Sequence, residues 1–172
     1  YIDGTEVSKM IEQYGRLDVG YAMRVAIQIA NALQHAFEKG IVHRDIKPEN
    51  VMVTAACQAK LVDFGLAKSF TSAGQSGLTA PGEGMGTLAY MPPEQATGEI
   101  ARIDERSDVY ALGGVLYSIL TLRPPYQGND ARSTLLQVAE GALVPPHVRA
   151  PEAQIPAELE AAVLHAMAHD PD

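Results

Sequence analysis

The stretch from Glu105 to Leu122 constrains the fold more strongly than any other part of the chain. Around a helix its apolar residues would point in nearly every direction; they are Val109, Leu112, Val115, Leu116, Ile119 and Leu120. A helix that is apolar on all sides has to be buried. Its charge-free part would be about 21 Å long, which is too short for the roughly 30 Å of hydrocarbon in a membrane. We therefore expect a central core helix, buried on every side, with the rest of the chain packed around it.

Length and charge narrow the class of protein. The 172 residues suit a single domain, and 47% hydrophobic residues are enough to line one core, which excludes intrinsic disorder. The 13 Lys and Arg residues against 21 Asp and Glu residues leave a net charge of −8, with no run rich in Lys or Arg. This balance argues against nucleic acid or an anionic membrane surface as a partner.

Cysteine content and the first residues bear on location. The lone cysteine, Cys57, cannot form an internal disulfide, so we expect a reducing, cytoplasmic location. Tyr1 to Gly4 include no initiator Met and do not begin a signal peptide. We expect a piece of a longer protein, with any membrane tether outside this chain.

Further helices flank the central one. Asp18 is a good N-cap for a helix that Gly40 is placed to end. Its core-facing stripe is expected at Val19, Ala22, Ala26, Ile29, Leu33 and Phe37. Asn129 or Asp130 is expected to cap a helix over 130–140. The residue pattern over 157–168 predicts a last amphipathic helix. His165 and His169 share a face of that helix but lack a third ligand, which favours a solvated surface over a metal site.

The remaining segments predict short strands and loops. Three brief apolar runs, 41–42, 51–53 and 61–62, are too short for helices and predict small strands. The stretch 69–86, rich in Ser, Thr, Gly and Pro, and the proline-rich stretch 145–156 predict loops. The expected fold class is therefore mainly α with a few short β-strands.

Four motifs follow one another along the chain. They are His43-Arg44-Asp45-Ile46-Lys47-Pro48-Glu49-Asn50, Asp63-Phe64-Gly65, Gly86-Thr87-Leu88-Ala89-Tyr90-Met91-Pro92-Pro93-Glu94 and Ser107-Asp108-Val109-Tyr110-Ala111-Leu112-Gly113. Each residue is commonplace alone, but together and in this order the motifs resemble those of the protein kinase family. The particular residues of the last two motifs are most similar to those of the bacterial eukaryotic-like Ser/Thr kinases. The resemblance implies that residues 1–172 are the large, C-terminal lobe of a kinase domain. The small lobe and the end of the large lobe would lie outside this chain.

The resemblance also implies the catalytic roles. Asp45 would accept the proton of the attacking hydroxyl, Lys47 would contact the transferred phosphate, and Thr87 would hydrogen-bond both side chains. Lys47 is typical of kinases that phosphorylate Ser and Thr, so the expected partners are proteins with such hydroxyls. Arg44 is typical of kinases switched on by loop phosphorylation. The expected phosphosite is Thr79, with Thr71, Ser72 and Ser76 as competitors; alternatively, all four are plain solvated loop residues.

ATP and Mg²⁺, with Mn²⁺ as a substitute, are the implied cofactors. Asn50 and Asp63 would bind the metal, since Mg²⁺ prefers oxygen ligands. Lys47, the backbone of Ile2, and Met52 as an apolar floor would contact the nucleotide. The expected structural residues are His43, Phe64, Gly65, Glu94 and Asp108.

The structural residues carry separate expectations. Asp108 would accept hydrogen bonds from the backbone at His43 and Arg44. Phe64, without the small lobe to stack on, would be partly exposed or swing inward. Glu94 would pair with an arginine beyond Asp172.

Two alternatives to a protein kinase stay open. One is a pseudokinase-like scaffold that uses the fold to bind partners, and the other is a small-molecule phosphotransferase of related fold. The chain lacks the family's glycine-rich loop, strand lysine and helix glutamate. For that reason we expect the isolated chain to be nearly inactive.

Overall fold

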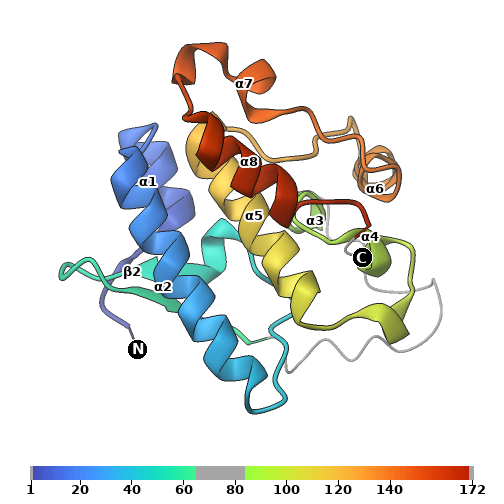
Figure 1. Cartoon of the computed structure of the whole chain (residues 1–172), viewed down its shortest axis with the longest axis horizontal. Coiled ribbons are helices and arrows are strands. Elements are labelled where there is room, and N and C mark those ends of the chain that lie inside the picture. Colours follow the sequence, from blue (N-terminus) through green and yellow to red (C-terminus); the bar gives the residue numbers. More distant parts are fainter. Residues whose placement is uncertain (1, 65–83, 171–172) are drawn as a thin grey trace.

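Helix α5, Glu105–Thr121, passes through the middle of the molecule, with helices α2 and α8 packed against it (Figure 1). The computed structural model describes residues 2–64 and 84–170. One side of α5, with Ala111, Val115 and Ile119, packs in a core with α2 and strand β2. The other side, with Tyr117 and Leu120 among others, packs in a second core with α8 and α6. The predicted central helix is confirmed.

Burial of α5 is less complete than predicted. Val109 is 47% exposed, although the helix was expected to be covered on every side. It lies in the first turns, where the wall of a cavity of about 450 Å³ takes the place of a packed neighbour. Further along, α8 approaches so closely that a Cβ on Gly113 would lie 2.8 Å from Cγ of Met167. Glycine at this position therefore permits the crossing of the two helices.

Helix α2, Val19–Phe37, begins as predicted, because the Asp18 side chain accepts a hydrogen bond from the amide of Tyr21 at 3.0 Å. Its buried residues are Ala22, Val25, Ile29, Leu33 and Ala36. The expected stripe is thus wrong at its end, where Phe37 is 41% exposed and Ala36 is buried instead. Ala36, three residues after Leu33, lies on the face of the helix that packs in the core. Phe37, four residues after Leu33, lies beyond the edge of that face.

The three strands form one small antiparallel sheet in the order β1, β2, β3. β2, Val51–Val53, matches the prediction, and β3, Ala59–Leu61, begins two residues earlier than expected. β1, Thr5–Glu6, was not predicted, because two residues carry no periodicity. The expected strand at 41–42 is wrong: this segment forms no strand and leads from α2 into the loop 43–50.

Two of the remaining helices were predicted from the sequence: α6 (Ala131–Ala139) and α8 (Ala157–Ala166). The elements that were not predicted are helices α1 (Val7–Tyr14), α3 (Gly84–Leu88), α4 (Pro93–Ala96) and α7 (Pro146–Arg149), and the 3₁₀ turns η1 (Pro48–Asn50), η2 (Ile100–Arg102) and η3 (Pro151–Ala153). α3 begins inside the expected loop 69–86, and α7 and η3 interrupt the expected loop 145–156. A proline in the first turn favours short helices of this kind, since its fixed φ suits that position.

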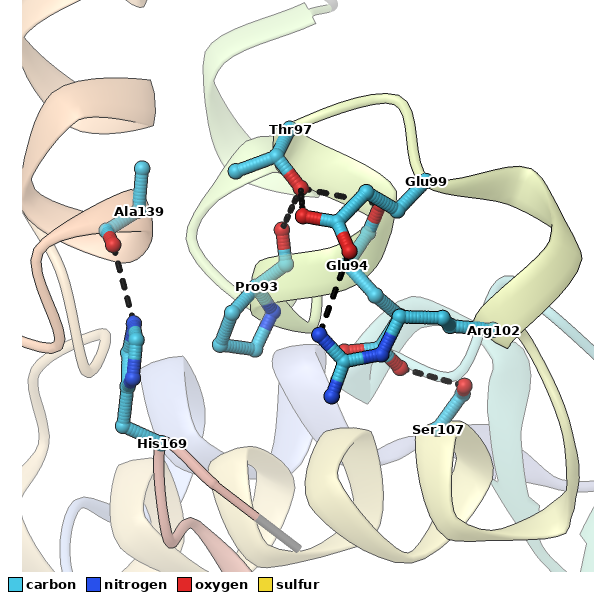
Figure 2. A network of polar contacts seen from close by, with 8 residues as sticks. All are labelled: Pro93, Glu94, Thr97, Glu99, Arg102, Ser107, Ala139 and His169. Carbon is cyan, nitrogen blue, oxygen red and sulfur yellow. Dashed lines mark hydrogen bonds and ion pairs between the residues drawn. The ribbon is translucent and has the colours of Figure 1, made fainter.

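Helix α8 ends two residues earlier than predicted, so His169 does not share a helical face with His165. Its ring Nε2 instead lies 2.9 Å from the carbonyl oxygen of Ala139 at the end of α6 (Figure 2). Of the helices that the structure describes, none combines the length and the hydrophobicity needed to cross a membrane.

Asp108, in the first turn of α5, connects this helix to the loop 43–50. It is 5% exposed, and its carboxylate oxygens accept hydrogen bonds from the amides of His43 at 2.7 Å and Arg44 at 2.9 Å. Burial raises the pKa of the Asp108 carboxyl, and the two amide hydrogen bonds oppose that shift. This contact was expected from the sequence, and the structure confirms it.

We expect Asp108→Ala to lower the free energy of unfolding by about 1–3 kcal/mol, because two amides that Asp108 satisfies lose their acceptor. Hydrogen exchange at the amides of His43 and Arg44 should accelerate as well. Glu105→Ala is the matched control, since it removes a carboxylate from the same helical turn without touching the loop. Equal effects of the two substitutions on exchange would contradict the role given to Asp108.

Leu122 ends α5 in a left-handed conformation, with φ 59° and 42% exposure. A non-glycine residue there costs about 1 kcal/mol relative to Gly. We expect Leu122→Gly to raise the free energy of unfolding by about 1 kcal/mol, as measured by urea denaturation. Leu122→Ala removes the same exposed side chain but keeps the strain, so it should give no gain. A gain with Ala as large as with Gly would show that conformation is not the cause.

Candidate active site

His43 starts the loop that carries most of the expected site residues. Its side chain is fully buried, its Nε2 lies 3.1 Å from the carbonyl oxygen of Val62, and its Nδ1 accepts from the amide of Asp45 at 3.3 Å. The ring also contacts Phe64, with the ring centroids 4.5 Å apart. Phe64 is half-buried, in line with the partial exposure expected for it. His43 therefore joins the loop to the segment that follows β3.

Four of the expected residues, Asp45, Asn50, Lys47 and Thr87, are linked by a chain of polar contacts. Oδ2 of Asp45 lies 3.1 Å from Nδ2 of Asn50 and 3.3 Å from Nζ of Lys47. Nδ2 of Asn50 also donates to the Asp45 carbonyl oxygen at 2.7 Å, and Lys47 donates to Oγ1 of Thr87 at 3.0 Å. The Asp45 and Lys47 side chains are only 12% and 19% exposed, so solvent screens this ion pair less than a surface pair.

The same hydrogen bonds leave oxygen atoms available for a cation. Asn50 uses its amide nitrogen toward Asp45, and no donor in the described part of the chain bonds its side-chain oxygen. Asp63 follows Val62, whose amide donates to the Asn50 carbonyl oxygen at 3.0 Å. The Asp63 carboxylate is exposed and has no partner among residues 2–64 and 84–170. One carboxylate and one amide oxygen suit Mg²⁺, which keeps several of its water ligands.

Two residues of this site have a strained backbone conformation. Arg44 and Asp63 have φ angles of 66° and 56°, in the left-handed region that favours glycine. Non-glycine residues in that region cost energy and persist where the surrounding structure fixes them. The Arg44 conformation is fixed by its amide hydrogen bond to Asp108.

Two residues expected at the nucleotide, Met52 and Ile2, lie near the small sheet. Met52 is half-buried in β2, opposite Glu6 of β1 and Lys60 of β3. Ile2 is half-buried in the segment that precedes β1. The segment that holds Ile2 leads into β1, and β1 pairs with the strand β2 that holds Met52.

Glu94 in α4 is fixed against α5 (Figure 2). Its carboxylate accepts a hydrogen bond from Oγ of Ser107, and Oγ1 of Thr97 donates to its carbonyl oxygen at 3.3 Å. Within the described residues no Lys, Arg or His pairs with this carboxylate, which lines the 450 Å³ cavity beside Val109. Ser107 was missed as a partner, although Asp104 and Ser107 form the N-terminal capping pattern of α5.

Five expected residues cannot be placed. Gly65 and the candidate phosphosites Thr71, Ser72, Ser76 and Thr79 lie outside the described residues. Arg44, the expected partner of a phosphorylated loop, is exposed.

Comparison with known sequences identifies relatives over the whole chain. Serine/threonine-protein kinase PknB of Mycobacterium tuberculosis (strain H37Rv) is 37% identical over 172 residues, which are 100% of this chain and 27% of PknB. The probable serine/threonine-protein kinase SCO3848 of Streptomyces coelicolor is 38% identical over 100% of this chain and 25% of its own length. PknD of M. tuberculosis (strain CDC 1551) is 39% identical over 99% of the chain and 25% of its own length. The chain thus spans about a quarter of these relatives.

The fold has a counterpart among solved structures. The crystal structure of Rad53 1–466 in complex with AMP-PNP superimposes with a TM-score of 0.77 over 99% of this chain and 41% of that one, at 24% sequence identity. The protein kinase domain family matches residues 1–165. The fold is therefore mainly α with a small β-sheet, as in the large lobe of a kinase, and the chain belongs to the protein kinase family.

Proposed function

We propose that the protein containing this chain transfers the γ-phosphoryl group of ATP to Ser and Thr hydroxyls of proteins. The observation that supports this most directly is the cluster at Asp45, where Asn50 and Lys47 both contact Oδ2 and Lys47 continues to Thr87. The relatives named as serine/threonine-protein kinases support the same reaction class.

Asp45 is the proposed general base. Hydrogen bonds from Asn50 and the Lys47 ammonium orient its carboxylate, so that an oxygen can accept the proton of an incoming hydroxyl. Lys47 would supply positive charge next to the transferred phosphoryl group, and Oγ1 of Thr87 accepts a hydrogen bond from that ammonium. Lys47 in this loop favours Ser and Thr over Tyr as acceptors, by the family resemblance.

Asn50 and Asp63 are the proposed ligands of Mg²⁺, with Mn²⁺ as a substitute. The metal, when bound, neutralises charge on the phosphate oxygens. Within the described residues, the Asp63 carboxylate has no partner and the side-chain oxygen of Asn50 accepts no hydrogen bond, so both are available as ligands. The adenine would lie against Met52, with the Ile2 backbone at its edge.

By the same resemblance, residues 1–172 form the large lobe of a kinase domain. The residues that bind the ATP phosphates from the opposite side in kinases, a glycine-rich loop and a strand lysine, are not in the sequence of this chain. We propose that another part of the longer protein supplies them. Arg44 would bind a phosphorylated loop residue, with Thr79 as the first candidate and Thr71, Ser72 and Ser76 as competitors.

In the complete kinase domain, we expect Asp45→Asn to lower kcat by several orders of magnitude, while ATP affinity changes little, because a general base acts mainly in the transition state. An Asp45→Asn variant that keeps most of its turnover would exclude Asp45 as the base.

Asp63→Asn should instead abolish Mg²⁺-dependent ATP binding, measured by calorimetry. Glu49→Gln is the matched control for both substitutions: it removes one exposed carboxylate from the loop that carries Asp45, and it should leave kcat and the ATP affinity unchanged.

The isolated chain, residues 1–172, should bind ATP far more weakly than the complete domain and phosphorylate no protein measurably. The reason is that its residues contact the nucleotide from one side only. The measurement is transfer of labelled phosphate from ATP to a generic Ser/Thr substrate. Robust transfer that is lost in Asp45→Asn would show that the small lobe is dispensable, contrary to this expectation.

A further inference from the structure

Two buried hydroxyl groups from distant parts of the chain form a hydrogen bond that the mechanism above does not use. Oη of Tyr90 lies 3.1 Å from Oγ of Ser118, and the two residues are 9% and 4% exposed. Burial raises the pKa of Tyr90 to about 12, so its hydroxyl keeps its proton at neutral pH. The contact is therefore a hydrogen bond between two neutral, buried groups, and either one left without its partner costs free energy.

Helix α5 provides a fitted surface for the Tyr90 ring. A Cβ on Gly114 would lie 3.2 Å from Cδ1 of Tyr90, so the ring packs directly on the bare backbone at that residue. Gly114 and Ser118 are four residues apart and share one face of the helix. The ring that rests on Gly114 thus brings its hydroxyl to Ser118.

A short backbone connection links Tyr90 to the proposed active site. The amide of Tyr90 donates to the carbonyl oxygen of Thr87 at 3.3 Å, which closes a tight turn between the two residues. Oγ1 of Thr87 accepts from Nζ of Lys47 at 3.0 Å, and the same nitrogen lies 3.3 Å from Oδ2 of Asp45. A displacement of the Tyr90 ring would therefore shift the oxygen that holds Lys47.

Helix α5 holds both halves of the site. Asp108 in its first turn fixes the amides of His43 and Arg44, at the start of the loop that carries Asp45. Ser118, about 15 Å further along the helix axis, fixes Tyr90 in the segment that carries Thr87. The relative position of these two segments sets the distance between Lys47 and Thr87.

We propose that Ser118 is a positioning residue for phosphoryl transfer: by holding the Tyr90 hydroxyl it fixes Thr87, and through Thr87 the Lys47 ammonium beside Asp45. This inference rests on the function proposed above. Ser118 touches neither nucleotide nor protein substrate in this role, and it acts through the three side chains between it and the reacting groups.

The test compares Ser118→Thr with Ser118→Val in the complete kinase domain. The two side chains have the same shape, so any disturbance from the added methyl group is shared, and only Thr keeps the hydroxyl. We expect kcat of Ser118→Val to be about ten-fold lower than that of Ser118→Thr, with KM for ATP equal within about two-fold. Assays run well below the unfolding temperature of both variants keep the folded fraction equal. Equal kcat values would overturn the proposal.

A second comparison tests the route through Thr87. In a Thr87→Ala background, Lys47 has lost the oxygen that Ser118 is proposed to position. The difference in kcat between Val and Thr at position 118 should then disappear, because interacting residues give non-additive effects. A ten-fold difference that persists in this background would show that Ser118 acts by another route, such as general destabilisation.

The outcomes separate this inference from the function on which it rests. If Asp45→Asn abolishes transfer while Ser118→Val matches Ser118→Thr, the kinase function stands and the positioning role is wrong. If the wild-type domain transfers no phosphate at all, both are wrong. The proposal is supported if Ser118→Val lowers kcat and Ser118→Thr retains it, and if the two variants have equal kcat in the Thr87→Ala background.

Discussion

The carboxylate of Asp108 is the interaction on which the site depends. It is buried in the first turn of a core helix, and it satisfies two consecutive amides of a loop that has no strand or helix of its own at that point. A buried carboxylate without these donors would be costly, and the amides without it would be equally so. Each side therefore requires the other, and the loop carrying Asp45 is fixed to the central core helix.

Helix α5 consequently has two functions that make opposite demands on its sequence. As a core element it needs apolar side chains, and Val115, Ile119 and Leu120 are each 1% exposed. As a support for the site it needs polar groups at particular positions, and Ser107, Asp108 and Ser118 supply them while buried. Every one of these polar residues has its partner, which is the condition for keeping polar groups in a core. Their partners all lie in the segments that build the site or its flank.

Sequence patterns predicted the long elements well and the short ones poorly. α2, α5 and α6 have caps and several turns of periodicity, and Asp18, Asp104 and Asp130 each accept a backbone hydrogen bond at the start of their helix. β1, α4 and α7 span only two to four residues, about one period of their own pattern, which is too short for a periodic signal to show. β1 exists because β2, far along the chain, pairs with it. Exposure of Val109 likewise depends on what packs nearby and could not follow from its own apolar character.

The sequence by itself determined the order of the motifs, and with it the family and the identity of the groups around Asp45. Asn50 is five residues from Asp45 and Lys47 is two, so a single loop brings these three together. Only the tertiary structure decided which distant groups complete the site. Thr87 is 40 residues from Lys47, Asp108 is 65 from His43, and Ser118 is 28 from Tyr90. Contacts over such separations depend on how the helices pack around α5. The chemistry of a side chain limits which partners it can bond, and the packing of the helices brings one of those partners within reach.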